Sequence, residues 1–149
     1  MGARTDAARA EVVASRQLLL EEVVRLQGMA SQQEVRAWWR EAAVGLLTSL
    51  AEGMPVSLME ALSSGVPVVA TAVGGIPEMI AAGVNGFVVP VNDPGAVADS
   101  IADILSSPEM ATQMSHAARE TALERFSLGH QVDSLLELWN QVLNSRHAA

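Results

Sequence analysis

Cysteine and lysine are both missing from this 149-residue sequence, and aromatic residues are scarce. Without cysteine the chain can form neither a disulfide framework nor a thiolate metal site. Because only three tryptophans and two phenylalanines supply aromatic bulk, the core must consist mainly of smaller aliphatic residues and methionine. The three histidines, His116, His130 and His147, have no ligand spacing among themselves, so we expect no metal and no cofactor.

Basic residues and long apolar runs are also few. Nine arginines stand against seventeen acidic residues, which gives a formal net charge of −8. Nucleic-acid binding needs clustered basic residues, so we expect no nucleic-acid partner. No run of about 18 apolar residues could span a bilayer, and Leu18–Leu20 is too short for the apolar part of a signal peptide. We therefore expect a cytoplasmic protein and leave open whether it associates with a membrane.

The length fits one compact domain rather than two. Short apolar segments predict strands at residues 22–27, 44–48, 66–71 and 86–90. Helical periodicity, caps and proline starts predict helices at residues 3–21, 31–42, 55–63, 77–82, 94–105, 108–126 and 127–144. Short strands that alternate with helices indicate an α/β fold, with a partial parallel sheet of three to four strands, flanking helices and a helical C-terminus.

Local signals add detail to this pattern. Ser31 followed by Glu34 is typical of a capping box at the start of a helix. Residues 44–48 form a short apolar run, as expected of a strand that is buried on both faces. Charges are scattered around the first predicted helix, so its apolar stripe is weak. We therefore expect a poorly defined helix at residues 1–21 and a domain at residues 22–149.

Two glutamates, Glu52 and Glu60, follow the strand predicted at residues 44–48, with seven residues between them. This position, just past the carboxyl end of a strand, is where open α/β sheets bind their ligands. Pro55 suits the first turn of a helix, because its missing N–H costs nothing there. Glu60 then lies roughly 7–8 Å further along that helix, at 1.5 Å per residue.

The residues between the two glutamates predict an anion site. Gly53 permits unusual backbone angles and a close approach by a ligand. The free amides around Val56 and Ser57 point out of a helix N-terminus, which suits a phosphate group. One carboxylate flanks each side of this site. A nucleotide-sugar has the matching layout, with sugar hydroxyls, a diphosphate and ribose hydroxyls.

These residues also have plainer interpretations. Glu52 could simply complement the dipole of the helix that follows it, and Glu60 alone would be an ordinary exposed helical residue. Gly74-Gly75 fits a plain turn as well as a ligand loop. Trp38 and Trp39 fit packing in the core and at the surface better than base stacking.

Five stretches of this sequence occur in the order that one known family uses. They are residues 47–55 (LTSLAEGMP), 60–71 (EALSSGVPVVAT), 74–78 (GGIPE), 83–94 (GVNGFVVPVNDP) and 125–127 (RFS). Together they resemble the donor-binding segment of the family-4 glycosyltransferases, and the resemblance runs from about residue 22 to the end of the chain. It implies a GT-B fold, in which two Rossmann-like domains face each other across the active site. Transfer from a nucleoside-diphosphate sugar would then retain the anomeric configuration, normally without a bound metal.

The resemblance also implies roles for single residues. In this family the first glutamate, here Glu52, contacts the transferred sugar, and the second, here Glu60, holds the ribose. Backbone amides between them address the sugar and the phosphates. The implied donor-binding set is Glu52, Gly53, Met54, Pro55, Val56, Ser57 and Glu60, with Glu52 also catalytic and the base near Gly28 and Met29.

Parts of the family pattern are missing from this sequence. The arginine and lysine that clamp the diphosphate, in a segment of the form G-R-x-x-x-x-K-G, are absent, as are the glycine-rich second strand and the acceptor-binding N-terminal domain. The resemblance thus implies an incomplete Rossmann-like, nucleotide-sugar-binding domain that needs the missing domain or a partner chain. Two functions remain: the donor half of an enzyme, inactive alone, or a non-catalytic binding module. A dehydrogenase is disfavoured, because no G-x-G-x-x-G is present.

Without the missing strands, the strand at residues 44–48 would have an open apolar edge, which favours pairing. One solution is that the strand at residues 22–28 slides in beside it, with the helix at residues 31–42 as a right-handed connection. The other is that two chains pair or exchange edges in a homodimer. The first solution needs the smaller change.

Overall fold

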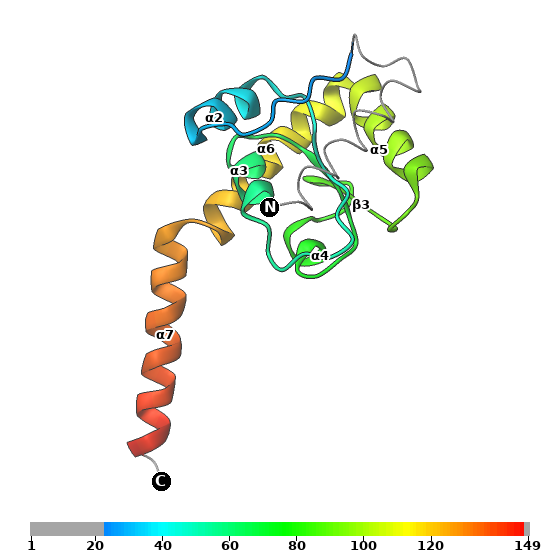
Figure 1. Cartoon of the computed structure of the whole chain (residues 1–149). Coiled ribbons are helices and arrows are strands. Elements are labelled where there is room, and N and C mark those ends of the chain that lie inside the picture. The colour runs from blue at the N-terminus through cyan, green and yellow to red at the C-terminus, as the bar shows by residue number, and fades with distance from the viewer. Residues whose placement is uncertain (1–22, 148–149) are drawn as a thin grey trace, which may run out of the picture. The chain divides into compact units, whose positions relative to one another are not determined.

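Figure 1 shows the computed structural model of this chain, which describes residues 23–147. The chain divides into two compact units, residues 1–34 and residues 35–149. The helix expected at residues 3–21 lies outside the described residues. The second unit contains the sheet and the two glutamates, so the site is built within it.

The strand predicted at residues 22–27 is wrong for the part that the structure describes. Residues 23–30 form no strand, and all of their side chains are exposed, Val23 by 73%. A strand needs a hydrogen-bonded neighbour and a buried face, and this segment has neither within the described residues. The apolar pattern alone therefore misled, and the solution in which a strand at residues 22–28 slides in beside residues 44–48 lacks that strand among the described residues.

The sheet has three parallel strands, in the order β1-β2-β3. They are β1 (Gly45–Leu47), β2 (Val68–Thr71) and β3 (Gly86–Val89). Gly45 pairs with Val68, which in turn pairs with Gly86. This confirms the predicted α/β fold with a partial parallel sheet, which consists of three short strands.

The expected burial of the first strand on both faces is wrong. Gly45 is buried and Leu47 packs against the core, but the side chain of Leu46 between them is 49% exposed. The reason is position, since β1 is an edge strand that pairs only with β2 among the described residues. In contrast, every residue of the central strand β2 is buried.

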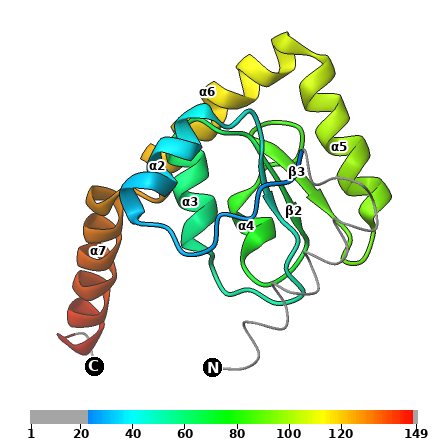
Figure 2. The ribbon, with the colours of Figure 1, turned by 45° about the horizontal axis from the view of Figure 1, so that its top comes forward.

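Two apolar clusters lie on opposite faces of β2. Val68 and Ala70 belong to one cluster, with α3 (Val56–Ser63), α4 (Ile76–Met79) and part of α6 (Pro108–Arg125). Val69 points the other way, into a cluster with α5 (Pro94–Ser106) and Met114 of α6. This alternation is the two-residue period of a strand that is covered on both faces. Figure 2 shows α3 and α4 on one side of β2 and β3, with α5 on the other.

The helix starts agree with their predicted caps. At the start of α2 (Gln32–Glu41), the Ser31 amide and hydroxyl donate to Glu34 Oε2 at 2.7 and 2.6 Å, which confirms the capping box. The Asp93 carboxylate accepts from the Ala96 amide at 3.0 Å and caps α5. Ser127 accepts from the His130 amide at 3.2 Å, at the start of α7.

The C-terminal helix α7 (Leu128–His147) has exposed side chains throughout residues 128–144. Several of them are large and apolar and recur at helical spacing: Leu128, Val132, Leu135 and Trp139. Every helix within residues 23–147 is nevertheless too short or too polar to cross a bilayer.

Candidate functional site

The N-terminus of α3 is open. Its first residue follows Pro55, an extended residue that offers no side-chain cap. The first intrahelical bond runs from the Leu58 amide to the Pro55 carbonyl at 3.2 Å, so the amides of Val56 and Ser57 precede it. Val56 is 64% exposed, and the side chain of Ser57 is exposed as well. Two amide donors and the positive end of a helix dipole therefore face solvent at this point.

This opening distinguishes α3 from α5 and α6, whereas the short helix α4 also starts without a side-chain cap. The N-termini of α5 and α6 are filled by their own side chains, Asp93 and Ser107. Proline at the corresponding position of α3 cannot act in this way, because it has no polar side chain. The amides of α3 are thus left for water or for a ligand.

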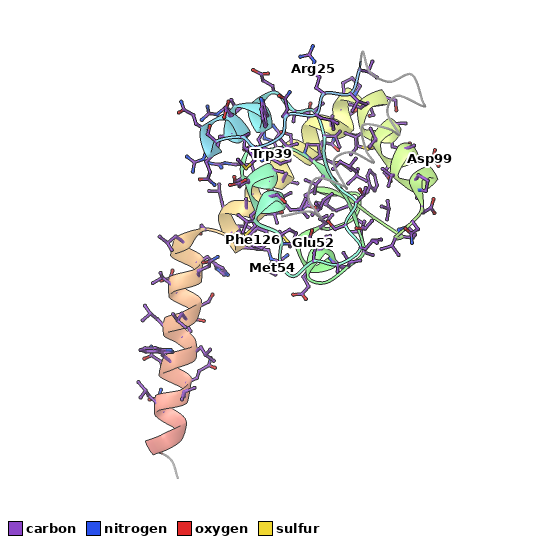
Figure 3. All side chains as sticks on the ribbon, in the orientation of Figure 1. Arg25, Trp39, Glu52, Met54, Asp99 and Phe126 are labelled. Atoms are coloured by element: carbon purple, nitrogen blue, oxygen red, sulfur yellow. The ribbon has the colours of Figure 1, made fainter. Side chains whose placement is uncertain are left out.

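Glu52 lies in the loop between β1 and α3, three residues before Pro55. Its side chain is half-buried, and the Ser49 hydroxyl donates to Glu52 Oε1 at 2.5 Å. Figure 3 labels Glu52 and Met54 beside each other near α4. The structure therefore brings the Glu52 carboxylate to the loop that precedes the open helix end.

The pair Gly74-Gly75 supports this loop from the opposite side. A Cβ on Gly74 would lie 1.8 Å from the carbonyl oxygen of Glu52, and its φ is +53°. The Gly75 amide donates to the Gly53 carbonyl at 2.7 Å. Of the two interpretations left open above, the structure favours neither alone. The glycines turn the chain into α4 and also let it pack directly on the Glu52–Gly53 backbone.

Glu60 lies in the second turn of α3 and is half-buried. It lines a hollow of about 780 Å³ among α2, α3 and α6, whose other lining residues include Arg36, Trp39 and Arg119. Several polar groups that line this hollow already form hydrogen bonds at the C-terminal end of α3. Arg119 donates to the Ser63 carbonyl, and the Ser63 and Ser64 hydroxyls donate to the Glu60 carbonyl at 2.9 Å each.

Other candidate residues fall outside this arrangement. Gly28 and Met29 belong to the first unit, so their nearness to the base stays a prediction. Trp39 packs against the core and Trp38 is 40% exposed, which agrees with the packing interpretation. Among residues 23–147, no group of three acidic or histidine side chains could hold a metal ion.

Sequence reasoning missed two hydroxyls that shape the site. Ser49, three residues before Glu52, carried a local signal, because serine often bonds to a nearby acidic side chain. Thr71 donates from the end of β2 to the Ser49 carbonyl at 2.6 Å. These two residues are 22 positions apart, so only the tertiary fold brings them together.

Known sequences place this chain in a family. The model of the family described as "Glycosyl transferases group 1" matches residues 8–121. WcaL of Salmonella typhimurium, named for a glycosyltransferase of colanic acid biosynthesis, is 37% identical over 131 residues, which cover 81% of this chain and 32% of WcaL. The D-inositol 3-phosphate glycosyltransferase of Streptomyces avermitilis is 34% identical over 103 residues, 69% of this chain and 22% of that protein.

Solved structures share the fold. Sucrose-phosphate synthase from Thermosynechococcus elongatus aligns with a TM-score of 0.83 and 25% identity over 95% of this chain and 35% of that one. HepE of Anabaena in complex with UDP aligns with a TM-score of 0.87 and 22% identity over 95% of this chain and 38% of that one. The sheet and its helices therefore have the architecture of one Rossmann-like domain of a GT-B protein.

The chain spans about a third of the length of the first curated relatives that it matches, WcaL of two bacteria. The family match extends over residues 8–121 and includes both glutamates and the open end of α3. By its sequence and its fold, the chain belongs to the group 1 glycosyl transferases.

Proposed function

We propose that this chain is the donor-binding part of a retaining glycosyltransferase that uses a nucleoside-diphosphate sugar. The diphosphate lies over the open N-terminus of α3, where the Val56 and Ser57 amides donate to it. Glu60 accepts hydrogen bonds from the ribose hydroxyls, and Glu52 accepts them from the transferred sugar. We also propose that the reaction takes place in the cytoplasm, as expected from the sequence.

The observation that carries this proposal is the uncapped start of α3, which follows the half-buried Glu52 in the chain and precedes the half-buried Glu60 in the second turn of the helix. An open helix N-terminus favours an anion, whereas carboxylates favour neutral hydroxyl donors and repel an anion. The arrangement therefore sorts the parts of a donor in space, with the phosphates at the amides and the hydroxyl-rich groups at the glutamates. The structure of HepE from Anabaena was determined with UDP-glucose, and its shared fold supports a donor of this class.

The same arrangement suits the departure of a nucleoside diphosphate. As the bond between the sugar and the phosphate breaks, negative charge grows on the leaving oxygen, and preorganised amides stabilise such charge. Glu52 would hold the sugar hydroxyls so that the anomeric carbon stays aligned with the leaving group. Retention of configuration requires the acceptor to arrive on the same face. The resemblance to the family supports that part of the proposal.

Donor affinity of this chain alone should be weak. The sequence lacks lysine, and it lacks the basic clamp that the family places on the diphosphate. Each missing charge-assisted contact removes about 1.5–3 kcal/mol of binding free energy. Transfer to an acceptor would also need the part of the relatives' length that this chain does not span.

Isothermal titration of the chain tests the proposal. We expect UDP to bind in the range of high micromolar to millimolar concentrations, and uridine, which has no phosphate, to bind at least about tenfold more weakly. Ser57→Pro, which removes one amide donor, should weaken UDP binding, whereas Ser106→Ala at the far end of α5 should not. Equal binding of UDP and uridine would contradict the proposal.

A non-catalytic binding module of the same fold is the second candidate, favoured by the missing basic clamp. Incubation of the chain with a panel of nucleotide-sugars and sugar acceptors separates the two. Turnover by this chain alone would exclude the module. Binding without turnover, followed by turnover when the chain is joined to an acceptor domain of a relative, would support the enzyme.

A further inference from the structure

The loop that carries Glu52 is tied to the rest of the second unit at two backbone points. At one end, the Thr71 hydroxyl donates to the Ser49 carbonyl at 2.6 Å, and Thr71 itself is only 3% exposed. At the other end, the Gly75 amide donates to the Gly53 carbonyl at 2.7 Å. One donor is the last residue of β2, and the other lies in the turn that follows it. The backbone of Glu52 is therefore held between two fixed points.

The side chain of Glu52 is held separately. The Ser49 hydroxyl donates to Glu52 Oε1 at 2.5 Å, in a partly buried position. A hydrogen bond to a charged group is short and strong, and it restricts the rotamers that the carboxylate can adopt. The second oxygen, Oε2, accepts no hydrogen bond from the described residues, so it can accept one from a ligand.

These contacts form a relay from β2 to the carboxylate. Thr71 fixes the backbone of Ser49, and the hydroxyl of that serine fixes Glu52. A carboxylate that is already oriented loses less conformational entropy when it binds a sugar hydroxyl. An oriented carboxylate also matters most for the part of the ligand that it touches, which is the sugar and not the nucleotide.

We propose that Ser49 is a positioning residue, which aims Glu52 at the transferred sugar while Thr71 holds Ser49 in place. This inference rests on the proposed function, because it takes the sugar as the ligand of Glu52. It goes beyond that function by naming the groups that orient the carboxylate. It also separates the sugar contact from the diphosphate contact at Val56 and Ser57.

The test compares the affinities of the chain for UDP-glucose and for UDP. Ser49→Ala should weaken the binding of UDP-glucose about two- to tenfold and leave that of UDP within about twofold. Ser49→Thr keeps the hydroxyl and should restore the affinity for UDP-glucose. Ser100→Ala is the matched control, because it removes another partly buried hydroxyl, which bonds to the Ala96 carbonyl in α5. Ser100→Ala should leave the affinities for UDP-glucose and for UDP unchanged.

A merely structural role for Ser49 gives a different pattern. If Ser49→Ala weakens the binding of UDP-glucose and of UDP equally, or weakens the binding of neither, the inference is wrong. Glu52→Gln distinguishes this failure from a failure of the proposed function. If Glu52→Gln weakens UDP-glucose selectively while Ser49→Ala does not, the proposed function stands without the inference. If Glu52→Gln changes neither affinity, Glu52 does not contact the sugar and both ideas fail.

A double substitution completes the argument. Once Glu52 is glutamine, the Ser49 hydroxyl has no carboxylate to orient, so Ser49→Ala should add less than about a twofold further loss of affinity. Independent, multiplied losses in the double variant would contradict the relay. Thr71→Val, which removes the first bond of the relay, should reproduce the selective loss for UDP-glucose, and Thr71→Ser should reverse it.

Discussion

Gly74 packs so closely on Glu52 that no Cβ fits between them, since that atom would lie 1.8 Å from the Glu52 carbonyl oxygen. The contact joins the turn after β2 to the loop after β1. Residues 52 and 74 meet there because β1 and β2 are parallel neighbours, whose carboxyl ends lie at the same edge of the sheet. The position of the site loop therefore depends on a glycine outside the loop.

We predict that Gly74→Ala destabilises the chain and displaces the Glu52 loop. The substitution meets backbone atoms, which cannot move aside cheaply, and it also forces a residue with a Cβ to adopt a φ of +53°. The second effect alone costs about 1–2 kcal/mol. Gly83→Ala is the control, because Gly83 has a φ of +78° but open space around it. Chemical denaturation should show a larger loss of unfolding free energy for Gly74→Ala, and equal losses would show that the contact is not tight.

A second prediction separates the roles of the two glutamates in a complete enzyme that contains this chain. Glu52→Gln should lower kcat about 10- to 100-fold with little change in nucleotide affinity, because the proposed function assigns Glu52 to the sugar. Glu60→Ala should instead raise the donor KM by a similar factor, because the proposed function assigns Glu60 to the ribose. Steady-state kinetics with varied donor concentration measures both. Equal effects of the two changes on nucleotide affinity would contradict this division.

The third prediction concerns the pKa of Glu34 in the capping box. The Ser31 hydroxyl and then the Ser31 amide, which both donate to its carboxylate, hold the pKa of Glu34 below its ordinary value of 4.5. A carboxyl group whose pKa is lower in the folded state stabilises that state above pH 4.5, and the contribution disappears as the pH falls through the folded pKa. The start of α2 should therefore fray progressively below pH 4.5.

Carboxyl NMR measures this effect directly. The Glu34 signal should titrate with a midpoint below 4.5, and Ser31→Ala should raise that midpoint toward the ordinary value. Ser31→Thr keeps a hydroxyl at the same position and should leave the midpoint low. A midpoint that is the same in all three proteins would mean that the capping box does not form in solution.

The fourth prediction is self-association of the chain. β1 pairs only with β2 among the described residues, and Leu46 on that edge strand is 49% exposed. Unpaired edges and exposed apolar side chains both favour contact with a second chain. We expect light scattering of the purified chain to give a mass above that of a 15.7 kDa monomer.

Two substitutions identify the surface that would form the dimer. Leu46→Arg places a charge on the edge strand and should restore the monomer if β1 pairs with its copy. Leu135→Glu should restore it instead if the exposed apolar face of α7 is the contact. A clean monomer before any substitution would show that neither surface associates.

Much of the fold could be predicted from sequence because its signals are local. Ser31, Asp93 and Ser127 each bond to an amide or carboxylate a few residues away, so their spacing alone marks a helix start. The run that became β2 is apolar up to Thr71 at its end, and the structure buries all of it.

The errors arise where a residue's surroundings come from distant parts of the chain. The run that became β1 looks like a buried strand, but its burial depends on how many strands lie beside it. The segment at residues 23–27 has the composition of a strand and no partner in the described structure. Likewise, nothing local connects Thr71 with Ser49, or Gly74 with Glu52.

The central claim is that the open N-terminus of α3 binds the diphosphate of a nucleotide-sugar and that Glu60 binds its ribose. Backbone amide NMR of the chain, titrated with UDP-glucose to millimolar concentrations, tests it most directly. The account predicts that the signals of Val56, Ser57 and Glu60 shift together in one saturable transition. The signal of the Ala96 amide, which already donates to the Asp93 carboxylate at 3.0 Å, should not shift. Saturable shifts elsewhere in the chain, with Val56, Ser57 and Glu60 unchanged, would contradict the account.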